Sequence, residues 1–372
     1  MSKKSFLIWV VGVAAALLCS MAGAQDSYVA EAQAYVARIS KPQPPWDGPT
    51  AGPAAQGKKS IIYISADQHN GGASGVGRAV EEAAQAIGWK FLLIDGEGTA
   101  AGRTAALTQA ADLNPDGIIL GTVDAKEQAA AIKKIATKNI KIVGWHALGR
   151  PGPSPDQGVF TNIATDPEEV AKGAAMYAVA DSDGKAEVVV FTDPAYEIGV
   201  AKSNAMVKVV RKCAGCRVLS VERIHHGEFR ATAALMNQRT ALLLQRFGKK
   251  WTHSIADNDL YFDFMLPSLL AAAIPGNGHP KNISAGDGSE PAFERIRQVH
   301  YQVGTVAEPL RLHGWQAIDE LNRAFAGKPP SGYSTSVHLV TAANIKFDGG
   351  PSNQFDPDNG YRDAYKKIWG GK

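Results

Sequence analysis

The glycine-rich stretch 70–79 is the part of this sequence whose residue types and spacing come nearest to cofactor chemistry. Loops of this kind bind dinucleotide phosphates at a helix N-terminus when their first glycine directly follows a strand. Here the polar residues 67–70 precede the first glycine, and the Asp67 carboxylate would repel a phosphate. The Tyr-x-x-x-Lys and Asn-Asn-Ala-Gly motifs of oxidoreductases with such a loop are absent from the sequence. We interpret these glycines as the turn of a polar loop into a helix at a cleft edge.

Cys213 and Cys216 are a second set of residues whose type and spacing could serve a chemical role. A Cys-x-x-Cys spacing suits a redox pair, half of a zinc site or a short-loop structural disulfide. The sequence has no second pair to complete a zinc site and no Trp-Cys-Gly-Pro context typical of thioredoxin-like proteins. In an oxidising compartment we therefore expect a structural disulfide between these cysteines.

Histidine and carboxylate patterns give no metal or hydrolase motif. His225 and His226 follow an expected strand, but the sequence has no His-x-x-x-His pair. Segment 356–360 is similar to a calcium loop, yet its glycine comes one position too early and no Glu closes it. A Gly-x-Ser-x-Gly elbow is also absent. We expect no catalytic residues, no metal and no cofactor.

The first 24 residues predict export. Lys3 and Lys4 precede an apolar run, and residues 22–24 form a small-x-small site, which is the layout of a signal peptide. We expect cleavage after Ala24 and a periplasmic mature protein, with a retained anchor or a lipid on Cys19 as alternatives. The apolar run is shorter than the roughly 20 residues that a spanning helix needs. A formal net charge of +3 without a basic block argues against nucleic acid as a partner.

The elements that must position any site form a leader and two series of alternating strands and helices. The leader, 25–57, combines an amphipathic helix over 28–39 with a proline-rich segment over 41–49. Strands are expected at 60–65, 91–94, 117–120 and 140–143 in the first series, and at 187–191, 217–223, 252–256, 283–286, 302–307 and 336–341 in the second. Intervening helices imply parallel βαβ units.

The predicted fold class is therefore α/β, with two doubly wound parallel-sheet lobes joined by a hinge. In such sheets ligands bind beyond the carboxyl ends of the strands, and closure of facing lobes would trap a ligand. The expected domains are the signal peptide 1–24, the leader 25–57, an N-terminal lobe of 58–165 plus 309–335, and a C-terminal lobe with tail of 166–308 plus 336–372.

In order and spacing, residues 58–341 resemble the ribose-type periplasmic sugar-binding proteins, which are type I solute-binding proteins related to LacI-type repressor cores. The resemblance implies the type I periplasmic binding protein fold and a binding role without catalysis. The matching phrases are 65–70, 121–124, 144–146, 162–166, 257–259, 285–288 and 305–309.

The same resemblance implies which residues contact a ligand. Carboxylates and amides accept or bridge hydroxyl hydrogens, and an aromatic ring can cover the apolar face of a sugar. Helix capping is the alternative role for the Asp and Asn residues. The expected ligand-binding residues are Asp67, Gln68, His69, Asp124, Trp145, His146, Tyr196, Asn258, Asp287 and Glu308.

This sequence departs from the ribose-binding pattern at three places. His146 and Ala147 stand where the family has an Asp-Arg pair, and Glu308 replaces an amide. A second family arginine has no match, with Lys202 as the nearest cation. We therefore expect a more acidic and less arginine-rich cleft, which suits another sugar, a polyol or an amine-bearing ligand better than ribose.

The sequence thus favours a monomeric periplasmic receptor that delivers a sugar or polyol to the membrane permease of an ABC importer. One alternative is the same fold acting as a ligand sensor for a chemoreceptor or sensor kinase. A more remote one is an exported enzyme or a short-chain-dehydrogenase-like oxidoreductase, for which we find no nucleophile and base pair.

Overall fold

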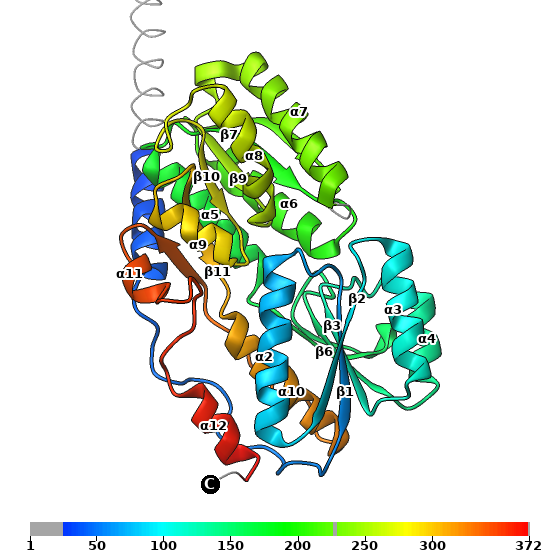
Figure 1. The fold of residues 1–372 in the computed structure, drawn as a ribbon. Coiled ribbons are helices and arrows are strands. Elements are labelled where there is room, and N and C mark those ends of the chain that lie inside the picture. The colour runs from blue at the N-terminus through cyan, green and yellow to red at the C-terminus, as the bar shows by residue number, and fades with distance from the viewer. Residues whose placement is uncertain (1–24, 226–228, 371–372) are drawn as a thin grey trace, which may run out of the picture.

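The structure is a computed structural model that describes residues 25–225 and 229–370. The chain forms two lobes that lie one against the other (Figure 1). Each lobe is built around one six-stranded sheet. The signal peptide expected over 1–24 and the second histidine of the pair at 225–226 lie outside the described residues. No described helix is both long and apolar enough to cross a membrane.

The first lobe has the strand order β2-β1-β3-β4-β6-β5, and every neighbouring pair is parallel except β5 with β6. The helices of this lobe are α2 (Gly71–Ile87), α3 (Ala100–Asp112), α4 (Ala129–Ala136) and α10 (Leu310–Phe325). Its strands are β1 (Ser60–Ser65), β2 (Lys90–Asp95), β3 (Gly117–Gly121), β4 (Lys141–Trp145), β5 (Gly152–Ser154) and β6 (Val159–Ile163).

The second lobe has the order β12-β11-β10-β9-β7-β8, parallel except for β12 with β11. Its helices are α5 (Pro167–Asp181), α6 (Glu197–Lys212), α7 (Phe229–Phe247), α8 (Leu260–Ala271), α9 (Glu290–Arg297) and α11 (Ile345–Asp348). Its strands are β7 (Glu187–Thr192), β8 (Arg217–Arg223), β9 (His253–Ala256), β10 (Lys281–Ser284), β11 (Gln302–Ala307) and β12 (His338–Thr341).

The two predicted doubly wound lobes are confirmed, and the differences are local. Strands β5 and β6 were not among the expected strands, because no helix separates β4 from β6 and β5 is only three residues long. Helix α2 begins where the glycine-rich stretch was expected to turn into a helix. Asn70 caps it, since its side-chain oxygen accepts hydrogen bonds from the N–H groups of Gly72 and Ala73. The structure pairs Cys213 with Cys216 after α6, with their Cα atoms 5.3 Å apart.

The leader contacts both lobes. Its helix, residues 25–39, packs on α5 of the second lobe, where Tyr28 and Tyr35 join the hydrophobic core (Figure 1). Farther along, Trp46 packs against Tyr333 and Tyr365 on the first lobe. The chain between these anchors passes the segments that connect the lobes, and a cavity of about 350 Å³ lies beneath it.

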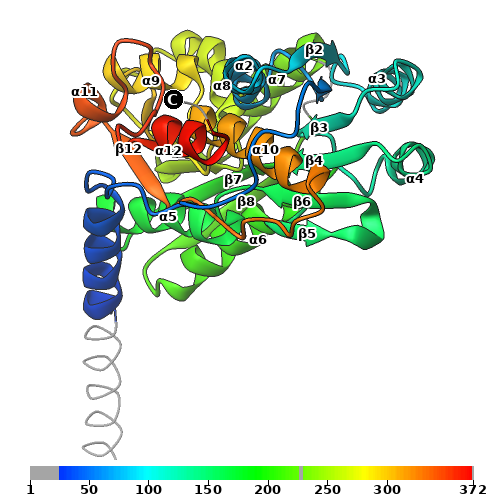
Figure 2. The same cartoon turned by 90° about the horizontal axis from the view of Figure 1, so that it is seen from below.

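The C-terminal tail ends on the first lobe. Helix α12 (Tyr361–Ile368) lies beside α10 (Figure 2), and Trp369 stacks on Trp315 with ring centroids 5.5 Å apart. From the sequence we assigned the whole of 336–372 to the second lobe. The aromatic residues of α12 instead complete the core of the first lobe, because they fill the space between α10 and the leader.

Besides the leader and the stretch before α12, three segments of the described chain pass between the lobes, namely 164–166, 308–309 and 326–337. They are bonded to one another. The backbone N–H of Thr165 donates to Glu308 Oε2 at 3.1 Å, and the hydroxyls of Thr165 and Thr335 lie 2.6 Å apart. These links hold the connections together as one hinge.

Candidate ligand-binding site

The carboxyl ends of the strands in the two sheets face each other and enclose a cavity of about 30 Å³. This volume is far below the roughly 300–1,000 Å³ of a typical small-molecule pocket, so the lobes are closed on one another. Both lobes contribute to its walls. The lining residues are Asn70, Thr122, His146, Tyr196, Ile198, Gly199, Lys202, Asp257, Asn258 and Asp287.

Two acids and two bases meet at this cavity, and all four side chains are buried. His146 Nε2 lies 3.0 Å from Glu308 Oε2, and His146 Nδ1 lies 3.7 Å from Asp287 Oδ1. The ammonium of Lys202 lies 3.6 Å from Asp287 Oδ1 and 3.8 Å from Glu308 Oε1. The ammonium of Lys202 therefore faces two buried carboxyl groups, and the ring of His146 lies between the same two groups.

The two carboxyl groups differ in their electrostatic surroundings. Burial would raise the pKa of Glu308, but the neighbouring His146 and Lys202 overcome this effect and lower it. Burial raises the pKa of Asp287, and the same two bases offset this only in part. Burial also lowers the pKa of His313, behind Glu308, to about 4. Glu308 is therefore the firmly ionised acid, and Asp287 is the acid that takes up a proton more readily.

Three oxygens at the centre have no hydrogen-bond partner among the described residues: Asp287 Oδ1, Glu308 Oε1 and Thr122 Oγ1. A buried acceptor without a donor is costly, so each such group needs an explanation, and a bound molecule or an ordered water can supply the missing donor. Asp287 and Thr122 line the cavity itself. The arrangement offers acceptors to a molecule that carries several O–H or N–H donors.

The backbone is specialised where the lobes meet. Thr122 and His146 both have left-handed φ, 60° and 53°, which is unusual for side chains other than glycine and is often found at functional sites. Gly72 lets α2 approach the second lobe, since a Cβ there would lie 2.2 Å from Asp287 Oδ2. Gly199 lets α6 approach Asp257 within the second lobe, where a Cβ would lie 2.6 Å from Asp257 Oδ2. The glycine-rich stretch therefore permits close contact between lobes, which is a reason unrelated to phosphate binding.

Four of the ten expected residues line the central cavity: His146, Tyr196, Asn258 and Asp287. Asn258 Nδ2 donates to Asp287 Oδ2 at 2.9 Å, so these two side chains act as a unit. Glu308 lies directly behind them through its contact with His146. Asn258, Asp287 and Glu308 were inferred from their place after a strand in the family pattern, whereas Tyr196 was expected only as an aromatic ring that could cover a sugar.

The other five expected residues are absent from the cavity lining. Trp145 is fully buried behind His146, whose ring stacks on it with centroids 4.0 Å apart. Asp67 binds within its own loop, where the N–H and Nδ1 of His69 lie 2.8 and 2.9 Å from its Oδ1. Gln68 and His69 are in that loop too. Asp124 lies at an outer groove instead.

Sequence reasoning missed the role of two cations. Lys202 reaches the centre from α6, although from the sequence it was only the nearest cation to a missing arginine. Arg103 is fully buried, pairs with Glu127 at 2.7 and 2.8 Å, and its Nη1 donates to Tyr196 Oη across the lobes at 3.3 Å. Arg103 itself is not part of the lining of the central cavity, which includes Asp257, Asp287 and Lys202, so the acidic and arginine-poor cleft stays a prediction. Neither Lys202 nor Arg103 follows a strand, so the pattern used to find site residues could not have found them.

His146, Asp287 and Glu308 also have the atom types and spacing of a metal site, with ligand atoms within 4.8 Å of one another. The ammonium of Lys202 lies near the same carboxylate oxygens and would repel a metal cation. The donor set therefore fits an internal ion-pair cluster better than a metal centre.

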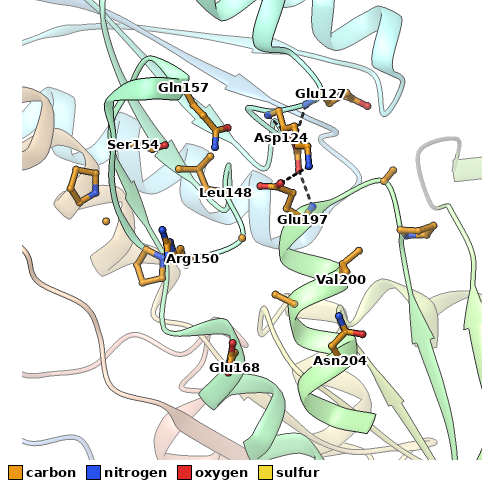
Figure 3. Close-up of a pocket in the computed structure, with 18 residues that line it drawn as sticks. Asp124, Glu127, Leu148, Arg150, Ser154, Gln157, Glu168, Glu197, Val200 and Asn204 are labelled. Carbon is orange, nitrogen blue, oxygen red and sulfur yellow. Dashed lines mark hydrogen bonds and ion pairs between the residues drawn. The ribbon is translucent and has the colours of Figure 1, made fainter. Parts of the chain in front are cut away.

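A larger groove of about 860 Å³ opens beyond the central cavity (Figure 3). One wall is the loop 148–154 of the first lobe, and the other is the start of α6 together with Glu168. At the end of the groove, Asp124 contacts Glu197 across the lobe boundary. Tyr196 lines the central cavity, and Asp124 lines the groove. The contacts that these two residues make across the lobes therefore lie between the groove and the cavity.

Comparisons with known proteins agree with this geometry. The sequence model of the periplasmic binding protein domain matches residues 61–329. No curated protein matches the chain.

Among solved structures, an ABC transporter solute-binding protein of Agrobacterium vitis with bound allitol has TM-score 0.67 and 18% identity over 78% of this chain and 97% of that one. Another solute-binding protein from A. vitis, bound with α-D-tagatopyranose, has TM-score 0.69 and 14% identity over 80% of this chain and 99% of that one. One from Mycobacterium smegmatis with bound glycerol has TM-score 0.67 and 17% identity over 80% and 99%. With its family model matched over most of its length and its two lobes in place, this chain belongs to the periplasmic binding protein family.

Proposed function

We propose that this protein is the periplasmic solute-binding component of an ABC importer and that it captures a sugar or polyol between its lobes. The observation that carries the proposal is the interlobe cavity, where Asp287 Oδ1 and Thr122 Oγ1 have no hydrogen-bond partner among the described residues and the ammonium of Lys202 supplies positive charge. The allitol, tagatose and glycerol complexes of structural neighbours support the choice of solute class.

A neutral polyhydroxylated solute suits this centre better than an ion. Each hydroxyl both donates and accepts, so it can meet the carboxylates and the ammonium together. A free cation would compete with Lys202 for the same two oxygens, and a free anion would face Asp287 and Glu308. Amine-bearing ligands, which the sequence left open, are for this reason less favoured.

Admission of a solute requires the lobes to separate, because a cavity of about 30 Å³ does not hold a sugar. The three bonded segments of the hinge provide the axis for such a motion. Closing the lobes around the solute would create the two-lobed surface that the permease recognises. We expect one chain to suffice for binding, as a monomer.

The test is a thermal-shift and calorimetric screen of the purified protein against neutral sugars, polyols, amino sugars and quaternary amines. A bound solute at about 100 times its Kd adds roughly 2.7 kcal/mol to the free energy of unfolding. The matched variants are Asn258→Ala, which removes a cavity amide, and Asn204→Ala, which removes an exposed amide from the same lobe. We expect only Asn258→Ala to weaken binding. Stabilisation by amines or anions alone, or equal effects of the two variants, would refute the proposed solute class or site.

A further inference from the structure

Asp124 joins the two lobes outside the central cavity. Its Oδ1 accepts hydrogen bonds from the N–H groups of Lys126 and Glu127, at 2.9 and 3.0 Å, which belong to its own loop. Its Oδ2 accepts a third hydrogen bond, at 2.9 Å, from the N–H of Glu197 in the first turn of α6 (Figure 3). The side chain is buried, with an exposed fraction of 4%. One carboxylate thus serves a loop of the first lobe and a helix of the second.

Helix α6 depends on this contact for the cap of its N-terminus. Tyr196 occupies the N-cap position, and its side chain makes no capping hydrogen bond. The first N–H groups of a helix lack partners within the helix, and a carboxylate there also interacts favourably with the helix dipole. Asp124 reaches Glu197 from the other lobe, so the cap exists only while the lobes are together.

A second contact between the lobes lies beside the first. The guanidinium of Arg103 is held by Glu127 and donates to Tyr196 Oη, which belongs to the residue just before α6. Glu127 in turn is in the loop that Asp124 organises. Loss of Asp124 would therefore affect both contacts, whereas Asp124 itself has no atom in the lining of the central cavity.

We propose that Asp124 is a closure residue, which stabilises the closed form by capping α6 across the lobe boundary and so sets solute affinity without touching the solute. The inference rests on the proposed function, since closure matters only if the lobes open and close around a solute. The apparent affinity of a protein rises with the fraction that occupies its binding-competent form. A residue outside the cavity can thus change affinity while selectivity among solutes stays the same.

Asp124→Asn separates the two roles of this side chain. The amide oxygen can still accept from Lys126 and Glu127, which preserves the loop, but the amide nitrogen then meets the Glu197 N–H, donor against donor. The matched control is Glu168→Gln, which neutralises an exposed acid in the wall of the same groove.

The measurement is the distance distribution between spin labels on Lys134→Cys and Lys208→Cys, exposed positions on α4 and α6, in protein without added solute. We expect Asp124→Asn to lower the closed-to-open ratio roughly two- to thirtyfold, the range of one helix cap, and Glu168→Gln to leave it unchanged. Circular dichroism checks that the variants are folded. If Asp124→Asn proves unstable, Asp124→Ser, whose hydroxyl is too short to span the lobes, replaces it.

A folded variant with an unchanged distribution would overturn the proposal. Because this readout uses no solute, it is independent of whether the screened sugars and polyols bind. Calorimetry with D-tagatose and allitol then adds a second check, if either binds. Asp124→Asn should weaken both by the same factor, and a change in their ratio would mean that Asp124 contacts solute after all.

Discussion

Adding one methyl group at Gly72 should block closure of the lobes. A Cβ at this position would lie 2.2 Å from Asp287 Oδ2, whereas ordinary contacts begin near 3.4 Å, so the two must separate by about 1.2 Å. Asp287 cannot easily yield, because it is buried and accepts a hydrogen bond from Asn258. Overpacking of this kind costs about 1–3 kcal/mol, and Gly72→Ala should therefore weaken solute binding roughly 5- to 150-fold.

The same substitution should not harm the fold, because alanine is a better helix former than glycine by about 1 kcal/mol and α2 lies on the first lobe. The assay is calorimetry with the solute found in the screen, together with urea unfolding without solute. Ser74→Ala, in the same turn, is the control that adds no atom. Unchanged affinity in Gly72→Ala would refute the view that this glycine exists for contact between the lobes.

Three further predictions concern buried charge, pH and redox state. Lys202→Met should lower the free energy of unfolding by about 3–5 kcal/mol in urea titrations at pH 7, because two buried carboxylates lose their counter-charge; unchanged stability would contradict the ion-pair cluster. Burial raises the pKa of Glu320 from 4.5 to about 7, so its contribution to stability is complete below the lower value and lost as pH rises through the upper one. Between pH 4.5 and 8 the free energy of unfolding of the wild type should fall by about 3 kcal/mol more than that of Glu320→Gln. Urea titrations that give parallel pH profiles for the two proteins would disprove this. Finally, Cys213 and Cys216 should resist thiol labelling until a reductant is added, and labelling without one would rule out the disulfide.

The fold was predictable because each lobe repeats one simple pattern. Local residue types indicate each unit of this pattern. One example is the buried strand Ser60–Ser65, which is followed by a helix that is capped by Asn70 and ends at Gly88. Strand β5 was not predicted because its three residues, which include Gly and Pro, show no alternation of apolar and polar side chains. The final helix was missed for another reason. Its burial depends on α10 and the leader, and no local pattern reveals which lobe will cover it.

The candidate site was predictable only where side chains follow strands. Asn258, Asp287 and Glu308 meet because parallel strands end at one edge of a sheet. Lys202 comes from within a helix, and its long side chain reaches the centre only after α6 has docked on the second sheet. The role of Lys202 was not predictable because it depends on this docking, which no spacing rule describes.

The contact of the leader with the tail has a consequence for the order of folding. Trp46 N donates to the carbonyl of Asn359 at 3.2 Å, and Ala55 N to that of Trp369 at 3.1 Å, so segments more than 300 positions apart in sequence lie side by side. Closing contacts over so long a stretch of chain is slow, and the first lobe cannot complete its core before the last helix has been synthesised. Nascent chains that end before α12 should remain sensitive to proteases in this lobe, although its whole sheet has already been made. Limited proteolysis of a chain truncated after Gln354, compared with the chain that runs to Lys372, would show the difference, and equal resistance would refute this order.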